Sequence, residues 1–217
     1  MSEDGLMITA DQYFSLKKNP YIILLHKEES SRGEFDSIAL RFIKMNYNCL
    51  AVDMRSGNRY GFIINETSVR AKEKGYNTSL YESLKDVNAA IEYVRKINLK
   101  TPFILLGSSF SSSLALITAK NDPDIKAIIA FSPGEFFLPE MELINVVKDY
   151  TKPVFAGFSL AEYPFFASDL MDIQNEHITL FKPSHGPGTR TAEALLSASA
   201  NAEEYWFALL VFIRSIR

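Results

Sequence analysis

A serine with small neighbours follows a short apolar run near the middle of the chain. Residues 103–106 are Phe-Ile-Leu-Leu, Gly107 and Ser108 come next, and Ser109 stands two residues before another small residue, Ser111. A buried strand, a cramped turn and a helix would hold Ser109 in strained backbone geometry, where small neighbours let the chain pass. A serine at such a nucleophile elbow can attack an acyl carbon. The alternative interpretation is a Ser-rich helix start, whose hydroxyls only cap the helix.

A serine nucleophile needs a base, and the sequence contains three histidines. His177 begins an apolar run, which puts it at the wrong end of a strand, and His26 ends a run that precedes the serine. His185 follows the last apolar run, in a loop at 182–188 that is rich in Gly and Pro and could hold an imidazole over the strand ends. Because serine, acid and histidine would then occur in the order known for such elbows, His185 is the predicted base.

The acid of a triad should follow the apolar run at 154–158. Glu162 is the nearest carboxylate after it. Asp169 and Asp172 lie further on, in a segment with a helical pattern, where a solvated face is the better interpretation. Glu135, which follows the preceding run, stays open as an alternative acid or as a plain turn residue.

Acyl transfer also needs two N–H donors aimed at the developing oxyanion. The backbone N–H of Phe110 comes directly after the serine and is the first predicted donor. The second is expected in the loop at 25–34, where we assign the backbone N–H of Lys27. The role of the Lys27 ammonium stays open, and a plain charged loop is the alternative.

The candidate catalytic residues can meet only in a fold that brings the ends of several strands together. Apolar runs that read as buried strands lie at 21–26, 49–53, 102–107, 127–131, 154–158 and 178–181. Helical spacing of apolar residues occurs at 35–43, 80–94 and 202–216. The alternation predicts a three-layer α/β sandwich, with a mostly parallel sheet of about six to eight strands and helices on both faces. Segments 6–9 and 12–16 could add a small antiparallel edge.

Composition limits the class of protein. The chain has 217 residues, of which 47% are apolar. This length and composition predict a single domain over 1–217 without a cap domain. The net charge is −3, and the basic cluster at 70–74 contains a glutamate and reads as a solvated loop, so no nucleic-acid surface is expected. No apolar run is long enough to cross a membrane. The polar, acidic N-terminus does not read as a secretory signal, which favours a cytoplasmic location.

Two stretches could form the walls of a site. The longest irregular stretch, at 54–78, is one, and 134–143 is the other, with Phe136, Phe137 and Leu138 as apolar surface for an acyl group. The histidines are too few and scattered for a zinc site, so neither a metal nor another cofactor is expected. The single cysteine, Cys49, lies in an apolar run and reads as a core thiol.

Taken together, these motifs resemble the α/β-hydrolase superfamily, in particular small capless members near the dienelactone hydrolases. The resemblance spans nearly the whole chain. It rests on the segments 22–26, 31–35, 53–57, the elbow at Ser109 and the Ser-His-Gly loop at 184–186. It implies an α/β-hydrolase fold, supports Glu162 as the acid, and implies that Asp53 and Arg55 tie a loop together. The chain departs from dienelactone hydrolases proper, whose nucleophile is cysteine, and has Lys27 where a glycine is usual.

The predicted function is a serine hydrolase that cleaves a carboxylic ester, lactone or similar small acyl substrate through an acyl-enzyme. In this scheme Ser109 attacks, His185 moves the proton and Glu162 holds the imidazolium. The expected partner is the small-molecule substrate, with neither nucleic acid nor membrane, and a homodimer is left open. The alternative is a non-catalytic binding protein on the same scaffold, because a fold does not guarantee a function.

Overall fold

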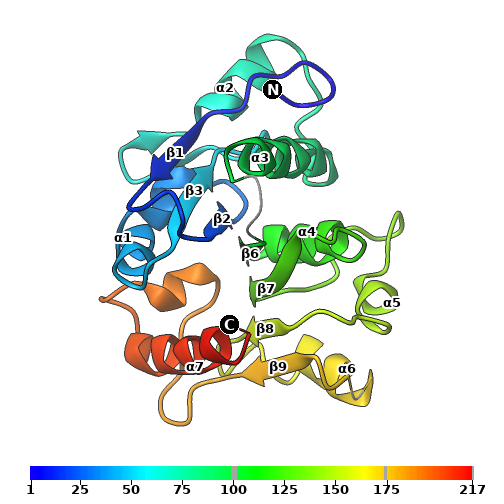
Figure 1. Ribbon diagram of the computed structural model, residues 1–217. Coiled ribbons are helices and arrows are strands. Elements are labelled where there is room, and N and C mark those ends of the chain that lie inside the picture. The colour runs from blue at the N-terminus through cyan, green and yellow to red at the C-terminus, as the bar shows by residue number, and fades with distance from the viewer. Residues whose placement is uncertain (99–101, 174, 217) are drawn as a thin grey trace.

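One twisted sheet organises the molecule, as the computed structural model shows for residues 1–98, 102–173 and 175–216 (Figure 1). Within this part of the chain the sheet has seven strands in the order β1-β3-β2-β6-β7-β8-β9. Their bounds are β1 Ala10–Tyr13, β2 Tyr21–Leu25, β3 Asn48–Val52, β6 Phe103–Ser108, β7 Ile125–Phe131, β8 Val154–Gly157 and β9 Ile178–Phe181. All neighbouring pairs are parallel except β1 with β3. The predicted fold class is confirmed.

Helices cover both faces of the sheet, which is why the central strands β2, β3 and β6 are buried throughout. Helices α1 (Asp36–Lys44) and α7 (Ala202–Ser215) pack on one face, and α3 (Leu84–Ile97) and α4 (Phe110–Ala119) on the other. Two shorter helices, α5 (Leu143–Val147) and α6 (Phe166–Ile173), lie near β8 and β9. The three single turns of 3-10 helix are η1 (Arg32–Phe35), η2 (Tyr81–Ser83) and η3 (Ala192–Leu195). Each helical layer forms its own apolar core against the sheet.

The edge next to β3 is antiparallel, as the sequence predicts. A single strand, β1, pairs antiparallel with β3, from Ala10 opposite Val52 to Tyr13 opposite Cys49. The edge is one strand at 10–13, which lies between segments 6–9 and 12–16 and overlaps the second of them. Cys49 is buried, as its apolar surroundings predict.

The stretch at 54–78 is not irregular, which corrects the expectation from sequence. It contains a two-stranded hairpin, β4 (Arg59–Tyr60) and β5 (Ile63–Ile64), followed by α2 (Glu66–Glu73). The basic cluster at 70–74 lies largely in this helix and not in a loop. The helix is polar, so apolar spacing does not reveal it, but Asn65 caps it by accepting the Ser68 N–H at 2.8 Å.

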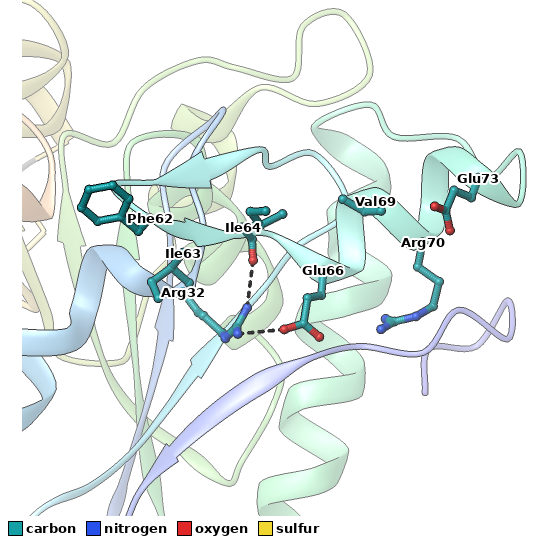
Figure 2. Close-up of a pocket in the computed structure, with 8 residues that line it drawn as sticks. All are labelled: Arg32, Phe62, Ile63, Ile64, Glu66, Val69, Arg70 and Glu73. Atoms are coloured by element: carbon teal, nitrogen blue, oxygen red, sulfur yellow. Dashed lines mark hydrogen bonds and ion pairs between the residues drawn. The ribbon is translucent and has the colours of Figure 1, made fainter.

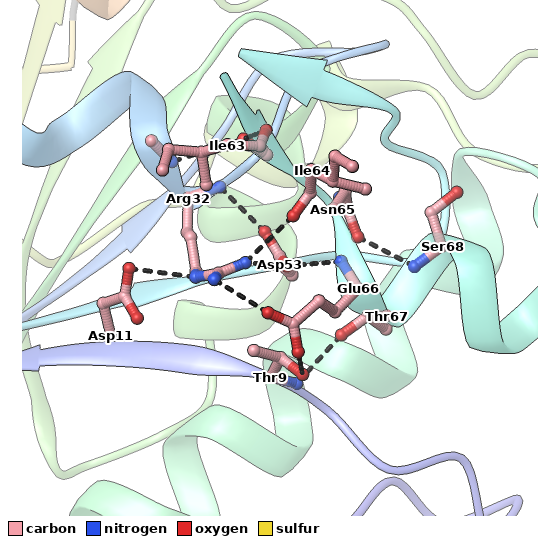
Figure 3. A network of polar contacts seen from close by, with 12 residues as sticks. Thr9, Asp11, Arg32, Asp53, Ile63, Ile64, Asn65, Glu66, Thr67 and Ser68 are labelled. Carbon is pink, nitrogen blue, oxygen red and sulfur yellow. Dashed lines mark hydrogen bonds and ion pairs between the residues drawn. The ribbon is translucent and has the colours of Figure 1, made fainter. Parts of the chain in front are cut away.

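Asp53 and Arg55 each tie loops together, although not to one another. The Asp53 carboxylate accepts the backbone N–H groups of Arg32 and Glu66 and pairs with the Arg32 guanidinium at 2.6 Å (Figure 3). Arg55 is fully buried and pairs with Asp86 at 2.8 Å. These contacts hold the hairpin, α2 and α3 against the sheet.

In the described part of the chain, no helix combines the length and the apolar character that crossing a bilayer requires.

Candidate active site

Ser109 stands at a sharp turn between β6 and α4, as the sequence predicts. Its backbone has φ 58° and ψ −127°, a region that residues other than glycine rarely adopt. Its N–H donates to the Phe131 carbonyl at 2.9 Å, and its carbonyl accepts the Ser112 N–H. Within the described residues its hydroxyl makes no hydrogen bond, and only 4% of the residue is exposed. The Ser109 hydroxyl is therefore held at the turn without a partner.

The small neighbours of Ser109 have distinct structural roles. A Cβ on Gly107 would collide with the backbone of Ser112, so the close approach of strand and helix requires glycine there. Ser111 is fully buried, and its hydroxyl donates to the Leu25 carbonyl at 2.7 Å and accepts the Ser108 N–H at 2.9 Å. Ser111 thus fastens the elbow to β2 and is not a free nucleophile.

The first residue of α4 is Phe110. Its N–H has no acceptor inside the helix, because the first N–H groups of any helix lack one. The positive end of the helix dipole lies at the same place. Phe110 therefore offers an N–H donor beside the Ser109 side chain, which fits the predicted first oxyanion donor.

The second predicted donor is engaged elsewhere. The N–H of Lys27 donates to the Glu34 carboxylate at 3.0 Å, so in this structure it is not free to bind an oxyanion. The next N–H in the loop, that of Glu28, makes no hydrogen bond within the described residues. The Lys27 ammonium, whose role the sequence left open, pairs with Glu193 at 2.6 Å and lies over the Tyr60 ring.

His26, which the sequence places at the correct end of the sheet, has a structural role. It is fully buried, and its Nε2 accepts the Met54 N–H at 2.9 Å. Its Nδ1 therefore carries the proton and donates to the Lys27 carbonyl at 2.6 Å. Burial lowers the pKa of His26 to about 4, so the ring is neutral near pH 7. These two hydrogen bonds hold the start of the loop at 25–34 against the residue that follows Asp53.

The predicted acid, Glu162, lies after β8 but is bonded to groups other than a histidine. One carboxylate oxygen accepts the hydroxyls of Ser159 and Ser132 at 2.8 and 3.0 Å and the Ser159 N–H at 3.1 Å. The other accepts the Arg190 Nε–H at 2.8 Å. Arg190, and not the predicted imidazole, thus bonds to this oxygen of Glu162.

His185 is exposed, and the structure does not bring it to Glu162. The loop that carries it is fastened to the start of α7, where the Asn201 amide donates to the His185 carbonyl and the Ser184 N–H donates to Glu204 at 2.9 Å. The Ser184 hydroxyl also donates to Glu204, at 3.1 Å. Serine and acid thus follow β6 and β8, with β7 between these two strands, while the predicted base lies apart from them.

Residues 187–193, which we call the strap, cross the carboxyl ends of four neighbouring strands. Beyond β8, Pro187 contacts Leu160 and Arg190 contacts Glu162. Thr191 contacts Ser132 beyond β7, and Ala192 contacts Ser108 at the end of β6. Glu193 contacts Lys27 beyond β2. The Thr191 N–H donates to the Ser132 hydroxyl at 2.8 Å, and the Ala192 N–H donates to the Ser108 hydroxyl at 3.0 Å. The strap connects the His185 loop to η3 and α7.

Glu135, the alternative acid, caps α5. Its two carboxylate oxygens accept the N–H groups of Leu143 and Ile144 at 2.6 and 2.8 Å. The side chains of Asp169 and Asp172, on α6, lie outside the described residues. Among the apolar residues expected at this wall, Phe137 is buried against Tyr81, whereas Leu138 is 54% exposed.

A surface pocket lies apart from the serine. Its volume is about 570 Å³, and it lies between the β4–β5 hairpin and α2 (Figure 2). Phe62, Ile64 and Val69 line it with charged residues, and none of the predicted catalytic residues does. Within the described residues no three His, Cys, Asp or Glu side chains gather in a way that could hold a metal ion.

Three residues around the elbow were missed from the sequence. Glu34 is buried behind Ser108, Arg190 lies on Glu162, and Glu193 lies on Lys27. Glu34 stands at the start of a helical pattern, where an acidic residue reads as an ordinary favourable charge at a helix N-terminus. Arg190 and Glu193 lie in a polar segment whose course the sequence pattern does not predict.

The fold and the elbow define an α/β-hydrolase. The family profile described as serine aminopeptidase, S33, matches residues 17–159. The chain belongs to this family.

Solved structures agree with that assignment at the level of the fold. An esterase of Pyrococcus furiosus superposes with a TM-score of 0.70 at 17% identity, over 99% of this chain and 90% of that one. A dienelactone hydrolase-like protein of Klebsiella pneumoniae gives 0.66 at 14% identity, over 95% and 98%. Est1E of Butyrivibrio proteoclasticus gives 0.65 at 18% identity, over 97% and 96%. No curated protein sequence matches significantly.

Proposed function

We propose that the protein is a serine hydrolase that cleaves a carboxylic ester, lactone or similar small acyl bond through an acyl-enzyme on Ser109. The observation that carries this proposal is the elbow. An unpartnered hydroxyl stands on a strained turn, and the N–H of Phe110 at the start of α4 lies directly beside it. Strain of this kind persists where a function requires it, since it costs about 1–3 kcal/mol.

In the proposed reaction, the Ser109 oxygen attacks the acyl carbon while His185 accepts the hydroxyl proton. The alcohol leaves with that proton, and water then releases the acid by the same steps in reverse order. Phe110 supplies one oxyanion donor. Lys27 was expected to supply the second, but its N–H is held by Glu34, so the N–H of Glu28 is the donor that the loop has available.

For His185 to act as the base, the loop that carries it has to move toward Glu162. Arg190 would then give up the Glu162 oxygen to the imidazole. Arg190 is 71% exposed, and exposed ion pairs contribute only about 0–1 kcal/mol, so giving up this one pair costs little. A working triad can contribute several kcal/mol to turnover, which is far more.

Covalent labelling tests the proposal without knowledge of the substrate. A fluorophosphonate should label the wild-type protein at Ser109, located by peptide mass spectrometry, and should not label Ser109→Ala. Short-chain p-nitrophenyl esters and small lactones should be hydrolysed, with aminoacyl p-nitroanilides as a comparison for peptidase activity. Absence of labelling together with absence of hydrolysis would contradict the proposal.

One observation favours a second candidate, a non-catalytic binding protein. His185 is exposed and fastened to α7, while Arg190 neutralises Glu162. If this arrangement is the permanent one, Ser109 has no base. Labelling of Ser109 separates the two candidates, because a serine without a base reacts slowly or not at all.

A further inference from the structure

A buried carboxyl group lies directly behind the elbow. Glu34 is 1% exposed, belongs to η1 and contacts Ser108, the residue before Ser109. One carboxylate oxygen accepts the Lys27 N–H at 3.0 Å, and the other accepts the Ser108 hydroxyl at 2.6 Å. The proposed reaction has no chemical step for this group.

The partners of Glu34 belong to two parts of the proposed site. Lys27 begins the loop that carries the second oxyanion donor, and Ser108 precedes the nucleophile. The Ser108 hydroxyl also accepts the Ala192 N–H of the strap at 3.0 Å. A single carboxyl group therefore joins the loop, the elbow and the strap.

Burying the Glu34 carboxylate costs free energy that burying an apolar side chain would not cost. Burial raises the pKa of Glu34 to about 7, although the Ser108 hydroxyl and the Lys27 N–H oppose the shift. An apolar residue in the same place would leave the Lys27 N–H unbonded, and a buried N–H without a partner also destabilises a fold. The carboxyl group is suited to the place because it accepts from two segments at once.

We propose that Glu34 is a positioning residue of the hydrolase, which fixes the loop at Lys27 relative to the elbow and so sets the spacing of the two oxyanion donors. This inference rests on the proposed function. Loss of one oxyanion donor lowers turnover by about 10²–10³-fold, and misplacement by about 1 Å can cost about 10²-fold. The position of the loop thus matters as much as its composition.

Glu34→Gln tests the inference, because the amide keeps the shape but offers one acceptor and one donor. It cannot accept from both Lys27 and Ser108. We expect the rate constant for fluorophosphonate labelling of Ser109, and kcat for p-nitrophenyl acetate, to fall by about tenfold or more, with KM within about threefold. Urea denaturation gives the folded fraction, so that both rates refer to folded protein.

Asp53→Asn is the matched control. Asp53 is another fully buried carboxylate that accepts two backbone N–H groups, but its partners are Arg32 and Glu66. This variant should lose stability, while its labelling rate stays within about threefold of wild type. The contacts of Asp53 lie outside the proposed site, so their loss should affect stability alone.

A double-mutant cycle isolates the link to the elbow. Ser108→Ala should lower the labelling rate by itself and should add little in the Glu34→Gln background, because both changes break one connection. If Glu34→Gln loses stability while labelling and kcat stay within about threefold of wild type, Glu34 is only structural and the inference is wrong. If the wild-type protein itself is neither labelled nor active, the proposed function fails, and this inference fails with it.

Discussion

Arg190 donates from its Nε to a Glu162 oxygen at 2.8 Å, so the acid predicted for the triad is paired with an arginine. The guanidinium is 71% exposed, whereas the Glu162 side chain is 15% exposed. An arginine cannot accept the proton of a serine, so this pair can only hold the strap and neutralise the acid. The pair makes Glu162 available only when the strap releases it.

Removing the guanidinium should therefore favour the active arrangement. We expect Arg190→Gln to speed fluorophosphonate labelling of Ser109 by up to about fivefold, which corresponds to an exposed ion pair of at most about 1 kcal/mol. Added salt should speed labelling of the wild type and have less effect on the variant. Arg41→Gln, which breaks the exposed pair with Glu203, is the control and should change neither rate. Slower labelling of Arg190→Gln would show that the pair supports the reaction.

The acid can be tested separately. Glu162→Gln keeps the shape but can present an amide NH₂ to His185 and favour the wrong ring tautomer, so turnover should fall by as much as about 10⁴-fold. Glu135→Gln removes a cap of α5 and should lower stability with little effect on turnover. Rates of ester hydrolysis and urea midpoints distinguish these effects. Retained turnover in Glu162→Gln with loss in Glu135→Gln would move the acid to the earlier strand end.

Backbone strain at the elbow predicts an asymmetry between two substitutions. Ser109→Ala should abolish labelling and leave the free energy of unfolding nearly unchanged, because alanine keeps the strained φ of 58°. Ser109→Gly should also be inactive but should be more stable than the alanine variant by about 1 kcal/mol or more, since glycine adopts this region freely. Urea denaturation of the two variants measures the difference. Equal stabilities would show that the turn is not strained.

The buried carboxyl of Glu34 predicts a pH dependence of stability. Its pKa is raised from the ordinary value of 4.5 to about 7, so the folded state binds the proton more tightly than the unfolded state. The contribution of Glu34 to the free energy of unfolding therefore rises as pH falls through 7 and reaches its full value below about 4.5. Relative to Glu34→Gln, the wild type should gain up to roughly 3 kcal/mol between pH 8 and pH 4.5.

This comparison removes the effect of His26, whose pKa is lowered to about 4 and which therefore reduces stability as pH falls. His26 is present in both proteins, so its contribution cancels in the difference. Free energies of unfolding from urea at several pH values provide the measurement. A difference that does not change with pH would mean that Glu34 titrates in the folded protein much as it does in the unfolded chain.

Local patterns were sufficient for the sheet and the elbow. Apolar runs bounded by turn residues predict the strands, and small residues around Ser109 predict the turn, because both depend on neighbours in sequence. Helix α2 was missed because its residues are mostly polar, and its stability comes from Asn65 and Asp53 instead of an apolar face.

The partners of the site residues could not be predicted in the same way. Arg190 reaches Glu162 and Glu34 reaches Ser108 only because of the course of the strap and of η1. Sequence order placed serine and acid at the carboxyl ends of strands, since the sheet fixes those positions. It could not show which side chain of the last loop would face the acid, because several conformations of a Gly- and Pro-rich loop are compatible with the same sequence.

The strap has a consequence for the order in which the protein folds. Its contact between Lys27 and Glu193 closes a separation of 166 residues, and the contact between Ser108 and Ala192 closes 84. Contacts this distant in sequence form late, because the entropy of closing the intervening chain has to be overcome first. The strand-turn-helix around Ser109 needs only local contacts and the neighbouring strands. A late intermediate should therefore carry a formed elbow before the strap is in place, and pulsed hydrogen exchange during refolding should protect the Ser109 N–H before those of Thr191 and Ala192.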